Sequence, residues 1–201
     1  MTIIDPKFEI PKDIFDKCVK FGLDSAPSST DKYARRNQSD PIKIAKDIRN
    51  GKIAEEMVYA KVVTDYPKLS KPDFNIYSKK DKSWDPDLKD QDSDMRIAVK
   101  SQEIESAIHY GESWVFQFGN GGKYDCDTGI FGKNIDPEHY VSFVLLNIAK
   151  RAGSLRAIVK VQWLHDKKLF KAMQKQNLQG NKVAVYYEDL LNYEKELWQL
   201  T

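Results

Sequence analysis

The sequence predicts a mixed α/β domain, with helices flanking a central sheet of mixed strand direction. Three observations support this fold class. Residues 42–62 carry apolar side chains at helical spacing, and several short segments after residue 72 alternate apolar and polar residues as strands do. The run 140–147 is almost entirely apolar, which is typical of a central strand. A chain of 201 residues is long enough to bury a core as one domain.

Composition narrows the class of protein further. Hydrophobic residues make up 41% and charged residues 31%, as in ordinary soluble globular proteins. The sequence has no apolar run of about 18 residues and no signal-peptide pattern, so we expect no membrane partner and a cytoplasmic location. Cys18 and Cys126 lack a CxxC partner, which argues against a zinc site or a disulfide framework. A net charge of +2 neither indicates nor excludes binding to nucleic acid, because basic and acidic surfaces can be segregated.

The first part of the domain, 1–39, is expected to hold a short amphipathic helix that ends near Gly22. The segment 26–38 is rich in small and polar residues and contains Tyr33, Arg35 and Arg36. Two interpretations remain open for it: a solvated surface loop, or an arm that contacts DNA through Arg and Tyr side chains.

The second part, 40–118, begins with a helix. Asp40 suits the N-cap and Pro41 the first turn. The helical pattern extends to about residue 62, but Asn50-Gly51 interrupts it, so we expect either two helices or one broken helix.

Short strands follow this helix. The expected elements are a meander of strands at 74–77, 84–88 and 95–99, a helical turn at 103–110 and a strand at 113–118. Trp114 and Gln117 lie on opposite faces of the last strand, Trp114 toward the core.

The third part, 119–201, begins with a glycine-rich turn that includes Lys123, either a mobile loop or a substrate contact. The remaining expected elements are strands at 140–147 and 155–164, a short helix at 167–175, a strand at 181–187 and a helix at 188–200. The three parts together form a single domain, 1–201.

The segment 84–102 carries the residues best suited to chemistry. Alternation places Asp85 and Asp87 on one face of their strand, and Ala98, Lys100 and Gln102 on one face of the next. If the two strands pair, one face presents Asp87, Lys100 and Gln102 together. The alternative without chemistry is an exposed cross-strand ion pair between Asp87 and Lys100, which would stabilise the fold by well under about 1 kcal/mol.

These residues resemble a known family. A helix with glutamate, a strand with Pro86-Asp87 and a strand leading to Lys100 look like the PD-(D/E)xK nuclease superfamily, over roughly residues 51–117. The resemblance implies a restriction-endonuclease-like fold. It makes Asp87 a metal ligand, and it makes Lys100 the group that orients the attacking water or steadies the transition-state charge.

The chain departs from the family pattern at Ala98, where an acidic residue is expected two positions before the lysine. The resemblance then implies that Glu55, or its neighbour Glu56, supplies the missing carboxylate from the helix. Gln102 resembles a polar residue that several branches carry two positions after the lysine.

The implied activity is magnesium-dependent hydrolysis of phosphodiester bonds in DNA by an endonuclease, site-specific in the manner of restriction enzymes, with Mn²⁺ as a substitute metal. DNA and a second copy of the chain, in a homodimer, are the expected partners. Two alternatives remain: a repair or junction-resolving nuclease, and a catalytically inactive DNA-binding domain of the same fold. The candidate site comprises catalytic Asp87, Lys100, Gln102 and Glu55, metal-binding Asp87, Glu55 and Glu56, and DNA-binding Arg35, Arg36, Tyr33, Gln117 and Lys123.

Overall fold

The computed structural model describes residues 7–34, 38–77, 87–117, 128–131, 138–174 and 182–193. The expectations at Asp85, Pro86, Arg35, Arg36 and Lys123 lie outside these residues. The described elements are β1 Lys7–Glu9, α1 Lys12–Ala34, α2 Pro41–Val62, β2 Leu88–Lys89, β3 Arg96–Glu103, α3 Ile104–Tyr110, β4 Ser113–Gln117, α4 Thr128–Phe131, β5 His139–Asn147, β6 Ala152–Lys160, α5 Val161–Asp166, β7 Lys171–Ala172, β8 Lys182–Tyr186 and α6 Tyr187–Asn192.

The main sheet has the strand order β1-β6-β5-β3-β2, and a second sheet has the order β4-β8-β7. In the main sheet β3 and β5 run parallel, while the other neighbours are antiparallel. The predicted mixed α/β architecture is therefore confirmed, and β5 is central as its apolar run indicated. The N-terminal strand β1, which pairs with β6, was not predicted.

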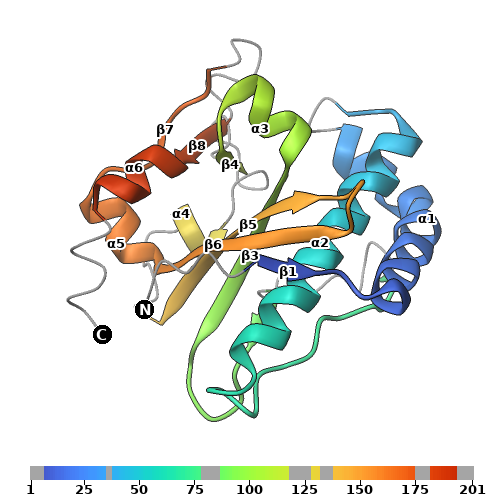
Figure 1. Cartoon of the computed structure of the whole chain (residues 1–201), viewed down its shortest axis with the longest axis horizontal. Helices are drawn as coiled ribbons and strands as arrows, with labels where there is room; N and C mark the ends of the chain where they lie inside the picture. Colours follow the sequence, from blue (N-terminus) through green and yellow to red (C-terminus); the bar gives the residue numbers. More distant parts are fainter. Residues whose placement is uncertain are drawn as a thin grey trace.

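The main sheet is covered on both faces. Helices α1 and α2 pack on one face, over a core that includes Ile53, Val58 and Ile97. The second sheet packs on the other face, over a core that includes Trp114 and Phe143. In Figure 1, α1 and α2 gather at one side of the molecule, and β7, β8, α5 and α6 gather at the other.

Helix α1 is much longer than expected. It continues past Gly22 and through Pro27 to Ala34, so the predicted helix end near Gly22 is wrong, and the predicted loop is wrong over residues 26–34. A Cβ atom at Gly22 would lie 2.5 Å from the Ala45 carbonyl oxygen of α2, so this glycine permits close helix packing rather than ending the helix. Tertiary packing therefore overrides the local signal.

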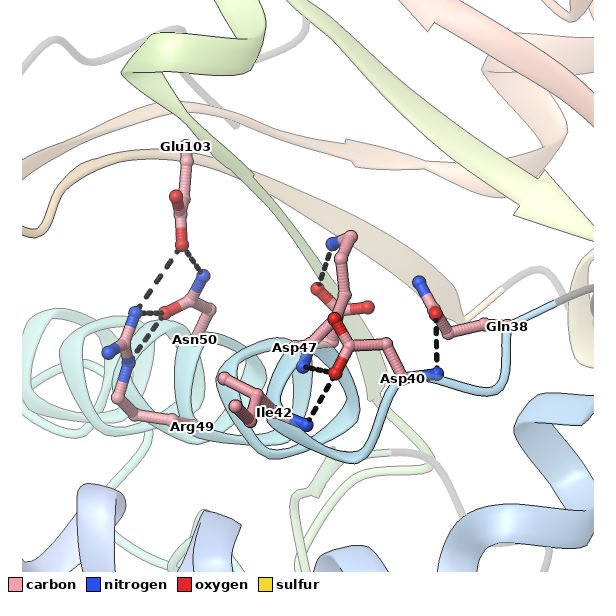
Figure 2. A network of polar contacts seen from close by, with 8 residues as sticks. Gln38, Asp40, Ile42, Asp47, Arg49, Asn50 and Glu103 are labelled. Carbon is pink, nitrogen blue, oxygen red and sulfur yellow. Dashed lines mark hydrogen bonds and ion pairs between the residues drawn. The ribbon is translucent and has the colours of Figure 1, made fainter.

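Helix α2 is continuous through Asn50-Gly51, so the expected break is also absent. The Asn50 side chain explains the continuity, because it donates a hydrogen bond to the Glu103 carboxylate at the end of β3 and accepts from Arg49 at 2.8 and 2.9 Å. Figure 2 shows this network near the middle of α2. A residue that looked like a turn signal instead ties the helix to the sheet.

The start of α2 is as predicted. Asp40 Oδ1 accepts hydrogen bonds from the backbone amides of Ile42 at 2.9 Å and Lys43 at 3.3 Å (Figure 2). Asp40→Ala is expected to lower the free energy of unfolding by about 1 kcal/mol, because these donors lose their cap. Asp40→Asn retains a side-chain acceptor and serves as the control in urea denaturation. Equal losses for the two variants would contradict the capping role.

Four further expectations differ from the structure, in whole or in part. Residues 74–77 form no strand, and the strand expected at 84–88 is described from residue 87, with β2 beginning at Leu88. The strand expected at 155–164 ends at Lys160, because Val161 and Leu164, three residues apart, are buried on one side of α5. The helix expected at 167–175 is replaced by β7, which pairs with β8.

Candidate active site

Asp87 lies at an edge of the main sheet, immediately before β2. Leu88 of β2 pairs with Ile97 of β3. Among the described residues, none before Leu88 pairs with β3. The next β3 amide that points toward this edge belongs to Val99, and it donates a hydrogen bond of 2.7 Å to Asp87 Oδ2. This hydrogen bond holds the exposed carboxylate in the plane of the sheet. It engages Oδ2 and not Oδ1.

Glu55 approaches the same edge from α2. Its neighbours Ile53 and Ala54 belong to the core between α2 and the sheet, which fixes the orientation of this helix turn. The Glu55 residue is 6% exposed, and its Oε2 lies 2.5 Å from Lys52 Nζ. Burial, followed by the charge of Asp87, raises the pKa of Glu55 from 4.5 to about 8. The carboxylates of Glu55 and Asp87 therefore lie close enough for the charge of Asp87 to act on Glu55.

Two residues near Glu55 were missed by the sequence interpretation. Lys52 pairs with Glu55, and Asp73 also raises the pKa of Glu55, more weakly than Asp87 does. Asp73 follows Pro72, so a second Pro-Asp pair in the chain could have drawn attention to it. Lys52 carried no comparable signal, because a Lys and a Glu three residues apart on a helix usually form a surface pair.

The shifted pKa of Glu55 has a consequence for stability. An acid whose pKa is higher in the folded than in the unfolded state binds more protons when folded, so stability falls as pH rises between the two values. In metal-free buffer, the free energy of unfolding should fall by a few kcal/mol between pH about 4.5 and pH about 8.

This pH dependence is measured by urea denaturation across the pH range. Glu55→Gln should flatten the curve because it removes the titrating group. Glu56→Gln is the matched control on the same helix turn. A Glu55→Gln curve parallel to that of the parent would contradict the assignment.

Lys100 lies on the opposite face of β3 from α2. Alternation along the strand places Glu103 toward α2, where it meets Asn50, and Lys100 toward the second sheet. Lys100 Nζ lies 4.9 Å from the centre of the Phe116 ring of β4. Glu55 and Lys100 therefore lie on opposite faces of the main sheet.

Gln102 has a structural role. Its Nε2 donates to the Gly111 carbonyl at 3.0 Å, and its Oε1 accepts from the Ser113 amide at 2.8 Å. These bonds attach the beginning of β4 to β3 across the turn at Gly111, whose φ of 74° suits glycine. Both ends of the Gln102 amide are thus engaged away from Asp87.

The remaining candidates are dispersed. Glu56 points toward α1, where it pairs with Lys17 at 2.8 Å. Tyr33 packs against a small core between α1 and α2, and it lies in a helix rather than in the expected arm. Gln117 is half-buried at the end of β4. Ala98 packs against the core between the two sheets.

Comparisons with protein-family models, with curated proteins and with solved structures each found no match. Among the described residues, no group of three or more His, Cys, Asp or Glu side chains is placed to hold a metal ion. None of the described helices combines the length and apolar character needed to cross a membrane.

Proposed function

We propose that the protein is a magnesium-dependent endonuclease that hydrolyses phosphodiester bonds in DNA, with a restriction-endonuclease-like fold and a cytoplasmic location. The observation that carries the proposal is the approach of Glu55 on α2 to Asp87 at the sheet edge. The order α2, β2, β3, with β2 and β3 antiparallel, supports the resemblance seen in the sequence.

The donor chemistry of Glu55 and Asp87 fits a hard divalent cation. Both offer carboxylate oxygens, which Mg²⁺ prefers, and Mg²⁺ commonly retains waters beside one or two carboxylates. Burial, and after it the charge of Asp87, raises the pKa of Glu55, and a bound cation would favour the charged form of this carboxyl. Strand alternation also aims the Val99 carbonyl at this edge, because its amide points there. Glu55 and Asp87 would hold the ion.

The reaction is hydrolysis at phosphorus. A water oxygen bonds to phosphorus, the bond to one sugar oxygen breaks, that oxygen takes up a proton from solvent, and the attacking water releases one. Bound Mg²⁺ would position this water and offset charge on the leaving oxygen. Asp87 and Glu55 orient the site from two elements of the fold, and Lys100 adds a cation from the other face of β3.

Cleavage of linear and supercoiled duplex DNA, with Mg²⁺, with Mn²⁺ and with a chelator, tests the proposal. Cleavage that requires the metal supports it. A protein that binds DNA in a salt-sensitive manner but cuts no substrate would instead be a binding domain. Junction and flap substrates separate a repair enzyme from a restriction-like one. Sedimentation on DNA tests whether two copies act together, as two strands to be cut would favour.

A further inference from the structure

The proposed site has an imbalance of charge on the α2 side of the sheet. Glu55 and Asp87 approach each other there, and Asp73 contributes further negative potential. Lys100 lies toward the second sheet, above the Phe116 ring, so it approaches from the opposite face. A cation on the same side as Glu55 therefore comes from an element other than β3.

Lys52 is that cation. It lies one turn before Glu55 on α2, and its Nζ is 2.5 Å from Glu55 Oε2. The Lys52 side chain is 16% exposed and that of Glu55 is 8% exposed, whereas the Lys43–Asp47 pair on the same helix is 56% and 34% exposed. Burying an ammonium group carries a substantial desolvation cost, so the Lys52–Glu55 pair differs from an ordinary surface ion pair.

Two aromatic rings lie close to the Lys52 ammonium group. Its Nζ lies 5.7 Å from the ring centres of both Phe21, in α1, and Phe74, in the segment before β2. The two rings pack edge to face at 5.1 Å, and Lys17 lies over Phe74 at 3.7 Å. Three segments of the chain therefore position one ammonium group beside the carboxylates.

We propose that Lys52 is a catalytic residue of this site. It pairs with Glu55 in the free protein and bonds a non-bridging oxygen of the scissile phosphate when DNA is bound. An ammonium group there offsets charge that develops on the phosphate in the transition state. The inference rests on the proposed nuclease function. It adds Lys52, on α2, to the motif residues Asp87 and Lys100, which lie beside β2 and in β3.

The test compares Lys52→Met, Lys52→Arg and Lys43→Met with the parent. Methionine retains an apolar stem against the two rings while removing the charge, and arginine retains the charge. Single-turnover cleavage gives the rate at saturating DNA, and calorimetry gives Mn²⁺ affinity without DNA. Lys52→Gln replaces Lys52→Met if circular dichroism finds that variant unfolded.

Lys52→Met should lower the saturated cleavage rate by about 100-fold, in the range found when one preorganised donor is removed. Lys52→Arg should recover part of the rate, Lys43→Met should match the parent, and Mn²⁺ binding should persist in all of them. A Lys52→Met rate equal to that of Lys43→Met overturns the inference. Loss of Mn²⁺ binding together with cleavage also overturns it, because Lys52 would then only support the metal site.

The nuclease proposal fails separately. If the parent cuts no DNA under any metal condition, both proposals are overturned. If the parent cuts DNA and Asp87 variants do not, while Lys52→Met does, only the role of Lys52 is lost.

Discussion

Asp87→Asn is expected to lower the rate of magnesium-dependent DNA cleavage by about 1000-fold or more, because it removes one of two carboxylates that would hold the metal. The amide oxygen can still accept the hydrogen bond from Val99, now 2.7 Å from Asp87 Oδ2, so the sheet edge should remain intact. Single-turnover cleavage measures the rate, and circular dichroism verifies the fold.

Asp92→Asn is the matched control, because Asp92 is an exposed carboxylate that pairs with Lys68 at 2.8 Å, in the turn after β2. It should cut DNA like the parent. A second readout tests proximity without cleavage: in Asp87→Asn the pKa of Glu55, followed by carbon NMR, should fall because the charge of Asp87 raises it. Parent-like cleavage by Asp87→Asn would remove Asp87 from the site.

Trp114→Ala is expected to lower the free energy of unfolding by about 3–5 kcal/mol, a large share of the stability of a typical domain. Trp114 is 1% exposed, and its ring centre lies 4.8 Å from that of Phe143 in β5. Its Nε1 donates to the Val144 carbonyl at 3.0 Å, so one side chain of the second sheet both packs against and bonds to the main sheet. Urea denaturation measures the loss.

Two variants separate the contributions of Trp114. Trp114→Phe preserves an aromatic ring but removes the hydrogen bond, so its loss should be smaller than that of Trp114→Ala. Val115→Ala, at a side chain 38% exposed on the same strand, should change stability by less than about 0.5 kcal/mol. A Trp114→Ala loss as small as that of Val115→Ala would mean that the two sheets do not unfold as one unit.

The parts of the fold that were predicted correctly depend on local patterns. The apolar run of β5 identified the central strand, and Asp40-Pro41 identified the start of α2. The errors at Gly22 and at Asn50-Gly51 have a shared cause. Each residue type usually ends or breaks a helix, but here it serves a contact between elements, with α2 and with β3 respectively. A local pattern contains no information about such a partner.

The candidate site was predictable to a similar extent. Strand alternation and the nuclease resemblance indicated Asp87, and the resemblance alone indicated Glu55. In the structure the charge of Asp87 acts on Glu55. Alternation placed Asp87 and Lys100 on one face, but the Asp87 side chain turns into the plane of the sheet to accept the Val99 amide. Lys52 escaped notice because its burial depends on α1 and on the segment before β2, which contact α2 only in the folded chain.

The pairing of β1 with β6 also constrains how the chain matures during synthesis. Residues 7–9 pair with residues 152–154, so β1 cannot complete its pairing until residues 152–154 have been synthesised. The parallel pairing of β3 with β5 imposes a shorter delay, because residues 96–103 pair with residues 139–146. Such long-range pairings slow folding and leave strand edges open to other chains. We therefore expect nascent chains that end before residue 152 to lack a complete main sheet and to depend on chaperones.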